Sequence, residues 1–259
     1  VLGMTAFVTG ATLVSRTFGP ATQLTKPGIS LRNIYPSSEE LLNTLIYGEP
    51  GAGLVNAASV FEQANIDDGI KGEKATSAQL FLVWTFLRRA LLFNSLRVPG
   101  LRSADIDHLL LVDDRALILD SKLWSPGYHT LCDGVVVSTY FAKGGNSRSY
   151  THSIMDYAAS TLRKELSHSE TRVTVDPYIV AHCRESSAPF ALINMITEES
   201  TSDVTLCDVG NVVHSAVGVA YESLEKVRSA SSEMNFGNDS RPFNFIDAEV
   251  VSRIVHLMK

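Results

Sequence analysis

The chain has 259 residues, of which 45% are hydrophobic and 19% charged, and its 22 Lys and Arg against 28 Asp and Glu give a formal net charge of −6 at pH 7. This much apolar material can bury a substantial core, which excludes a wholly disordered chain. An acidic chain does not coat nucleic acid indiscriminately, so binding to DNA or RNA requires a local basic patch.

The N-terminal part, residues 1–68, gives few signals of regular structure, and we expect it to form an arm of short helices and irregular chain. Its first 14 residues are apolar and stop before Arg16, which falls short of the roughly 20 residues that a membrane-spanning helix needs. A buried segment, a signal-peptide remnant and the stub of a membrane anchor are the three interpretations that remain. Three prolines within residues 17–37 indicate irregular structure, and the Ser-Ser-Glu-Glu of residues 37–40 indicates the start of a short helix.

Hydrophobic periodicity predicts helices and strands in the remainder of the chain. Apolar residues recur at helical spacing over residues 69–93. After Pro99-Gly100 the pattern changes to short runs rich in β-forming residues, which predict strands at 106–112, 116–124, 134–141, 178–183, 189–195 and 204–209. Helical patterns occupy three further segments, 148–166, 211–228 and 246–258.

This order of elements predicts an α/β fold, a three-layer sandwich in which helices flank a central mixed β-sheet. The consecutive leucines from Leu109 to Leu111 favour a strand that is buried on both faces. We expect residues 69–230 to form this core, and residues 231–259 to form a C-terminal linker and helix.

The residues that carry chemistry are concentrated on two neighbouring predicted strands. A two-residue turn at 113–114 places Asp107 opposite Asp120, whereas a four-residue turn places Asp107 opposite Lys122. In both registers the two aspartates and the lysine share one face, because strand side chains alternate. Two opposed carboxylates repel unless a cation lies between them, and carboxylate oxygens suit Mg²⁺ or Mn²⁺ better than zinc. The alternative is that Lys122 is an ordinary cross-strand ion-pair partner of Asp107.

This arrangement resembles the PD-(D/E)xK nuclease superfamily and, more narrowly, the nuclease-related NERD domain. The resemblance covers about residues 69–225 and implies the restriction-endonuclease-like form of the three-layer fold. Three motifs carry it in the order that the family has: Gly72-Glu73 on the first helix, Ile106-Asp107-His108 on one strand and Asp120-Ser121-Lys122 on the next.

The resemblance implies metal-dependent hydrolysis of phosphodiester bonds in DNA or RNA. On this basis Asp107 and Asp120, with the carbonyl of Ser121, hold one or two Mg²⁺ or Mn²⁺ ions, which polarise the phosphate and lower the pKa of a bound water. Lys122 positions or deprotonates that water and stabilises negative charge on the phosphate. Glu73 contacts the metal directly or through water.

Lys143 and Arg148 are candidates for binding the substrate backbone. They flank a Gly-Gly break that precedes the predicted helix 148–166, and the free N–H groups at a helix N-terminus suit a phosphate. The alternative is that both residues belong to a solvated loop.

Two departures from the family pattern favour a second interpretation. Asp120 stands where the family usually has Glu, and the predicted helix 148–166 lacks a Gln that many relatives carry. On this interpretation the chain is a catalytically degenerate descendant that serves as a binding or assembly module, tethered by its N-terminus to a membrane or a larger particle.

The cysteines bear on the compartment. Three scattered cysteines, without a C-x2-C pair, are too few for a disulfide framework and do not match a structural zinc site. They indicate a reducing compartment, so we expect a cytoplasmic protein, with association to a membrane through the N-terminus as the alternative.

Overall fold

The computed structural model describes residues 46–56, 63–87, 90–101, 105–140, 147–151, 153–167, 172–185, 189–195, 200–233 and 248–258. Its strands are β1 (Ile46–Tyr47), β2 (Ala90–Arg97), β3 (Asp105–Val112), β4 (Arg115–Trp124), β5 (Gly127–Cys132), β6 (Val135–Tyr140), β7 (Ser147–Thr151), β8 (Thr174–Cys183), β9 (Phe190–Met195) and β10 (Thr205–Cys207). Its helices are α3 (Ala52–Asn56), α4 (Gln63–Leu87), α5 (Ser153–Leu166), α6 (Val209–Glu233) and α7 (Ala248–His256).

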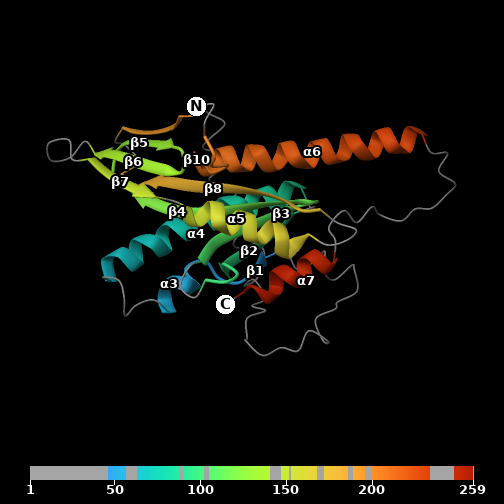
Figure 1. Ribbon diagram of the computed structural model, residues 1–259, viewed down its shortest axis with the longest axis horizontal. Coiled ribbons are helices and arrows are strands. Elements are labelled where there is room, and N and C mark those ends of the chain that lie inside the picture. Colours follow the sequence, from blue (N-terminus) through green and yellow to red (C-terminus); the bar gives the residue numbers. More distant parts are fainter. Residues whose placement is uncertain are drawn as a thin grey trace.

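The fold is α/β, as predicted, with a mixed central sheet between helices (Figure 1). Within the described residues this sheet has six strands in the order β1-β2-β3-β4-β8-β10. The segment from β2 to β4 is antiparallel, whereas β8 runs parallel to both β4 and β10. The arrangement fits a three-layer sandwich.

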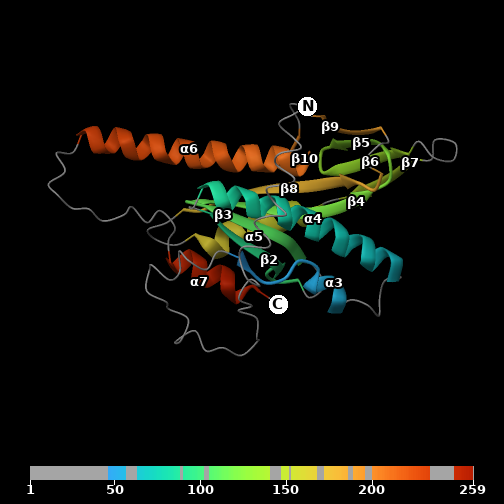
Figure 2. The same ribbon diagram turned by 180° about the vertical axis from the view of Figure 1, so that it is seen from behind.

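Each face of the central sheet carries its own apolar layer. On one face, Leu110 and Leu117 pack with residues of α4 and α6. On the other, Leu109 and Ile118 pack with residues of α5 and α7, and Figure 2 shows α4 crossing the face opposite α5. Because strand side chains alternate, consecutive apolar residues supply both layers, which explains the unbroken leucine run on β3.

The hairpin between β3 and β4 has the two-residue turn. Val112 pairs with Arg115, and the backbone pairing continues in the same register to His108 and Leu119. Asp113 adopts a positive φ of 52° in the turn, a conformation that Asp tolerates better than most residues. The first of the two registers considered for the site is therefore confirmed as far as His108.

A second sheet lies beside the end of β4 and was not expected. It has the order β7-β6-β5-β9, and it contributes Leu131 and Val136 to the same apolar layer as α5. Its β5–β6 hairpin turns at Asp133-Gly134, where both residues have positive φ, 45° and 74°. Asp-Gly favours this kind of two-residue turn.

Two predicted helices were too long. The helix predicted over 69–93 ends at Leu87, and residues 90–97 form β2. Leu91 and Leu92 therefore point to opposite faces of the sheet rather than along one side of a helix. Periodicity fails here because a short, continuous apolar run is compatible with either structure. The helix predicted over 148–166 begins at Ser153, because the residues before it form β7.

Segments from both ends of the described chain extend the same edge of the central sheet, beside β2. β1 runs parallel to β2, and Tyr47 stacks on Phe93 with ring centroids 4.7 Å apart. Near the C-terminus, Leu257 accepts a hydrogen bond of 2.8 Å from the backbone N–H of Arg97. The short helix predicted after residues 37–40 lies outside the described residues. None of the described helices is long and apolar enough to cross a membrane.

Helix α4 lies directly on β4 at a buried glycine. A Cβ atom at Gly72 would lie 3.5 Å from the backbone N of Leu123 and 3.6 Å from its Cβ. One methyl group fits at ordinary contact distance, but a longer side chain has no space without separating the helix from the strand.

We expect Gly72→Leu to destabilise the fold by about 1–3 kcal/mol, because overpacking displaces the helix. Gly72→Ala should be neutral or stabilise by up to about 1 kcal/mol, because alanine favours a helix. Denaturant unfolding of both variants measures this difference. Gly218→Leu is the matched control, since a Cβ atom at Gly218 on α6 would meet nothing within 4 Å. An equal loss in all three variants would contradict the packing argument.

Candidate active site

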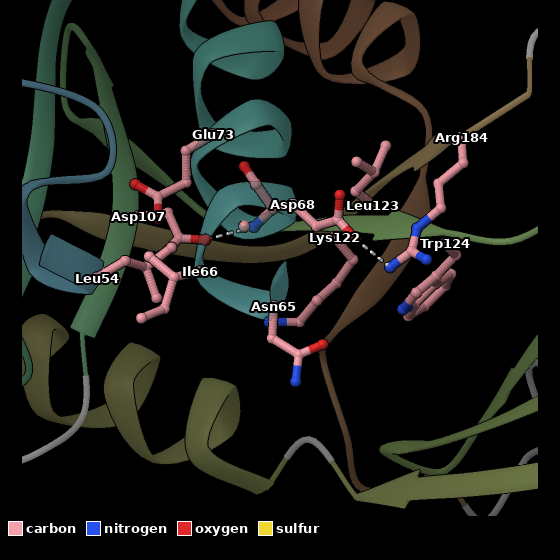
Figure 3. A pocket seen from close by; sticks show the side chains of 12 residues that line it. Leu54, Asn65, Ile66, Asp68, Glu73, Asp107, Lys122, Leu123, Trp124 and Arg184 are labelled. Atoms are coloured by element: carbon pink, nitrogen blue, oxygen red, sulfur yellow. Dashed lines mark hydrogen bonds and ion pairs between the residues drawn. The ribbon is translucent and has the colours of Figure 1, made fainter. Parts of the chain in front are cut away.

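A cavity of about 280 Å³ opens where α4 crosses the ends of β3 and β4 (Figure 3). Leu54, Ile66 and Trp124 contribute to its apolar walls. Its charged lining residues come from α4, β3, β4 and the residue after β8: Asp68, Glu73, Asp107, Lys122 and Arg184. The structure therefore brings Glu73, Asp107 and Lys122, which are far apart in the sequence, to one cavity, and Ser121 also lines it.

Glu73 is a buried carboxyl, with only 4% of the residue exposed. The backbone N–H of Gly51 donates a hydrogen bond of 2.6 Å to its Oε2. Burial raises the pKa of Glu73 to about 7, and the charge of Asp120 adds to this, against the Gly51 hydrogen bond and the charge of Lys122, which lower it. Near neutral pH, and without a metal ion, Glu73 is therefore partly protonated.

The loop that presents the Gly51 amide is attached to β2. The hydroxyl of Ser95 donates to the carbonyl of Glu49 at 2.9 Å, and the Asn94 amide donates to the carbonyl of Gly48 at 3.2 Å. Ser95 has a positive φ of 56°, which is rare for a residue other than glycine. These contacts fix the donor that orients Glu73.

Asp107 lies where the backbone pairing of β3 with β4 ends. Its Oδ2 accepts a hydrogen bond of 2.6 Å from the backbone N–H of Ser121. Burial raises the pKa of Asp107 well above its usual range, and the nearby charges of Asp120 and Glu73 raise it further. Carboxylates that lie this close together repel when ionised, which favours a proton on one of them.

Lys122 pairs with Asp120, two residues away on β4, rather than with Asp107 as the simpler interpretation of the sequence had it. The distance from Nζ to Oδ1 is 2.6 Å. Burial alone would lower the pKa of Lys122, but the charges of Asp120 and Asp107 outweigh it, so the pKa is raised. Lys122 is therefore a cation at neutral pH. In this state it can position water and stabilise negative charge, but it has no free lone pair with which to accept a proton.

A chain of buried hydroxyls joins the site to β8. The hydroxyl of Ser121 donates to that of Thr76 at 2.9 Å, and Thr76 lies 2.7 Å from Nε2 of His182. Burial lowers the pKa of His182, so this imidazole is neutral at pH 7. Thr76 lies three residues after Glu73 and thus on the same side of α4. The chain fixes α4 relative to β4 and β8.

His108 occupies a second buried polar position, next to the site. Its Nδ1 lies 2.7 Å from Oδ1 of Asn94, whose amide donates to the backbone carbonyls of Tyr47 and Gly48. Because the Asn94 oxygen is an acceptor, we assign the proton of the ring to Nδ1. Burial lowers the pKa of His108 to about 3. The ring is therefore neutral and structural rather than a general acid.

The carboxylates of Glu73, Asp107 and Asp120 have the donor chemistry for a hard divalent cation, since oxygen ligands suit Mg²⁺ and Mn²⁺. Each also accepts at least one hydrogen bond or ion pair within the protein, from Gly51, Ser121 or Lys122. Among the described residues, no three His, Cys, Asp or Glu side chains are already arranged as a metal cage. The donor types fit, but a metal ion would have to draw carboxylate oxygens away from their present positions towards a common point.

The candidate backbone-binding residues lie elsewhere. Lys143 falls outside the described residues. Arg148 is exposed on β7, where it pairs with Ser138 of the second sheet, and it does not line the cavity. It precedes the start of α5 by five positions, so the expected placement at a helix N-terminus is wrong. Residues 148–151, which were predicted as the first turn of the helix, belong to β7 instead.

Arg184 is the cation that sequence reasoning missed. It directly follows β8, its backbone N–H donates to the carbonyl of Trp124 at 2.9 Å, and its side chain lines the cavity. Finding it requires knowing that β8 lies parallel to β4, a pairing between distant segments that no local motif announces. The position of Arg184 at the end of a predicted strand was the single available signal.

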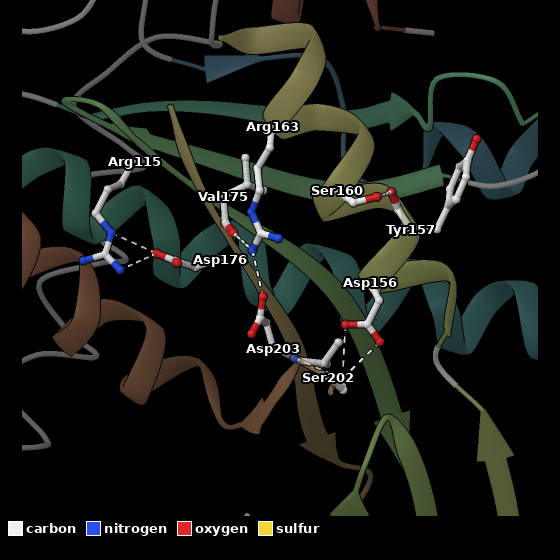
Figure 4. A network of polar contacts seen from close by, with 10 residues as sticks. Arg115, Asp156, Tyr157, Ser160, Arg163, Val175, Asp176, Ser202 and Asp203 are labelled. Atoms are coloured by element: carbon white, nitrogen blue, oxygen red, sulfur yellow. Dashed lines mark hydrogen bonds and ion pairs between the residues drawn. The ribbon is translucent and has the colours of Figure 1, made fainter. Parts of the chain in front are cut away.

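A separate polar network, outside the cavity, has contacts on both faces of the central sheet: those of Arg163 lie on the α5 side and that of Arg115 on the α6 side (Figure 4). Arg163 donates to the carbonyl of Val175 at 2.6 Å and pairs with Asp203 at 3.2 Å. Arg115 pairs with Asp176 at 2.7 Å, which joins β4 to β8. None of these residues lines the cavity, so this network supports the fold rather than the site.

Comparison of the chain with protein-family models, with curated proteins and with solved structures gives no match. The functional interpretation therefore depends on the geometry of the cavity and on the motifs in the sequence.

We expect Glu73→Gln to stabilise the metal-free chain at high pH. The folded state holds the Glu73 proton more tightly than the unfolded state, since the pKa is about 7 against an ordinary value of 4.5. Ionised Glu73 therefore costs stability as the pH rises through this window. The gain should be about 1–3 kcal/mol at about pH 8 and below about 1 kcal/mol at about pH 5.

Chemical unfolding in EDTA at the two pH values measures this dependence. Glu222→Gln, at an exposed position on α6, is the control and should show no such change. A gain that is the same at both pH values, or a loss at the higher one, would contradict the stated protonation of Glu73.

Proposed function

We propose that the chain is a metal-dependent nuclease of the PD-(D/E)xK type, which hydrolyses phosphodiester bonds in DNA or RNA. One observation carries the proposal: Glu73, Asp107 and Lys122 converge on one cavity from three separate elements, with Asp120 bonded to Lys122. Grouping buried carboxylates costs folding free energy, and such costs are concentrated at functional sites. The order of the three motifs in the sequence supports the same assignment.

Asp107 and Asp120 are the residues that would hold Mg²⁺ or Mn²⁺, with the Ser121 carbonyl as a further oxygen ligand and Glu73 in direct or water-mediated contact. The bound ion supplies charge that polarises the phosphate and lowers the pKa of a coordinated water. The backbone amides of Gly51 and Ser121 hold two of these carboxylates in place. Because the carboxyl of Glu73, with a pKa of about 7, is partly protonated near neutral pH, binding of a metal ion there would release protons.

Lys122 acts as the fixed cation of the proposed site. Its ammonium is held by Asp120, remains protonated at neutral pH and stabilises the negative charge that builds on the phosphate oxygens. A preorganised cation in a partly buried cavity contributes more than one in open water, because surrounding water screens it less. Lys122 thereby binds the reacting phosphate and orients the attacking water.

Lys122→Ala and Asp120→Ala should each reduce Mn²⁺-dependent cleavage of oligonucleotides by at least about 100-fold, because each removes a group that acts in the transition state. Asp114→Ala, in the exposed turn of the same hairpin, is the control and should cleave normally. Circular dichroism checks that all three variants are folded. Undiminished cleavage by both site variants would remove the catalytic assignment.

Mn²⁺ should raise the unfolding temperature of the wild-type chain, because an ion that binds only the folded state stabilises it by mass action, by about 2.7 kcal/mol at 100 times its Kd. Asp107→Asn should lose this increase, whereas Asp176→Asn, in the separate polar network, should keep it. Differential scanning calorimetry in millimolar Mn²⁺ measures both.

The second candidate function, a catalytically degenerate binding or assembly module, is favoured by the lack of a ready-made cage among the described carboxylates. It predicts neither cleavage nor a shift with Mn²⁺. The same calorimetric experiment therefore separates the two functions.

A further inference from the structure

Arg184 occupies a well-defined place at the cavity. The parallel pairing of β4 with β8 ends at Trp124 and Cys183, and the Arg184 N–H extends it by one hydrogen bond to the Trp124 carbonyl. The backbone at Arg184 is thus fixed, while 44% of its side chain is exposed. Figure 3 shows its guanidinium on the opposite side of the cavity from Glu73 and Asp107, with Lys122 between them.

The guanidinium is held by an ion pair that an incoming anion can replace. Nη2 of Arg184 lies 2.6 Å from Oδ2 of Asp68 on α4. An ion pair that is this exposed contributes little to stability, because water screens the two charges. Asp68 also lies 3.7 Å from Nζ of Lys71, so it keeps a cationic neighbour when Arg184 moves away. Replacement of Asp68 by another anion at the Arg184 guanidinium therefore costs little free energy.

The chemistry of the cavity favours a phosphodiester as that anion. Its cationic lining residues are Lys122 and Arg184. Lys122, paired with Asp120, is assigned above to the reacting phosphate, and the planar guanidinium of Arg184 can bind two oxygens of another phosphate side by side. A strand whose reacting phosphate lies at Lys122 therefore meets Arg184 with a neighbouring phosphate.

We propose that Arg184 forms a subsite for a phosphate next to the reacting one in a single strand of nucleic acid, and that its ion pair with Asp68 is the resting state that the strand displaces. This subsite rests on the nuclease function proposed above. It recognises the backbone and not the bases, so its contribution is independent of sequence. Arg184 binds substrate and takes no part in the chemical step.

Binding of a fluorescein-labelled oligothymidine, with Ca²⁺ in place of Mn²⁺ to slow cleavage, tests the subsite by fluorescence anisotropy. Arg184→Gln should raise Kd about 10-fold at low salt and flatten the slope of log K against log salt by about 0.7, which is the contribution of one phosphate contact on a single strand. Arg184→Lys should restore the slope. Asp68→Asn, which frees the guanidinium, should lower Kd by about two- to five-fold.

Arg115→Gln is the matched control, because Arg115 forms a similar ion pair, of 2.7 Å with Asp176, outside the cavity. It should change neither Kd nor the slope. In cleavage assays Arg184→Gln should raise KM and leave kcat within about three-fold, as expected for the loss of uniform binding.

Three results would each overturn the subsite. Arg184→Gln could keep the wild-type Kd and salt slope, Arg115→Gln could weaken binding as much as Arg184→Gln does, or the wild type could fail to bind the oligothymidine. Failure of the proposed function is a different result: the wild type binds the strand with the stated dependence on Arg184 but does not cleave it with Mn²⁺. In that case the subsite stands as part of a binding module.

Discussion

The contact between α4 and β4 at Gly72 is the constraint on which the site depends. Because no side chain intervenes there, the helix lies against Leu123, and the next residue, Glu73, reaches the cavity that Asp107 also lines. One turn later, Thr76 meets the Ser121 hydroxyl. If a larger side chain at this position displaced the helix from the strand, Glu73 would move away from Asp107 and Thr76 from Ser121. The small residue is therefore as much a part of the site as the charged ones.

Formation of the site costs folding free energy, and favourable contacts elsewhere in the fold offset this cost. Burial and mutual repulsion raise the pKa values of Glu73 and Asp107, so their ionised forms oppose folding. The two apolar layers of the central sheet offset this cost, since buried apolar area is the main favourable contribution to folding. Backbone amides and the Lys122 ammonium reduce the cost locally. A divalent cation bound between the carboxylates would relieve it further and would link stability to metal binding.

The sequence predicted those features that depend on local chemistry. Alternation placed Asp107, Asp120 and Lys122 on one face in either of two registers, and the structure selects the register with the two-residue Asp-Asp turn. The order of the motifs suggested that Glu73 lies with Asp107. It failed at β2, where a continuous apolar run suits a helix or a buried strand equally. It also missed β5, although Asp133-Gly134 between alternating residues is a strong hairpin signal. Arg184 and the Gly51 donor depend on contacts between distant segments, which no local pattern encodes.

The hydrogen bond from Gly51 to Glu73 spans 22 positions of the chain, and it makes the segment before α4 part of the candidate site. A fragment trimmed to begin at α4 would keep every motif that resembles a nuclease, yet its key glutamate would lack the amide that steadies it. Such a fragment would also lose the wall formed by Leu54. The smallest unit able to work is therefore larger than the stretch in which the motifs are found.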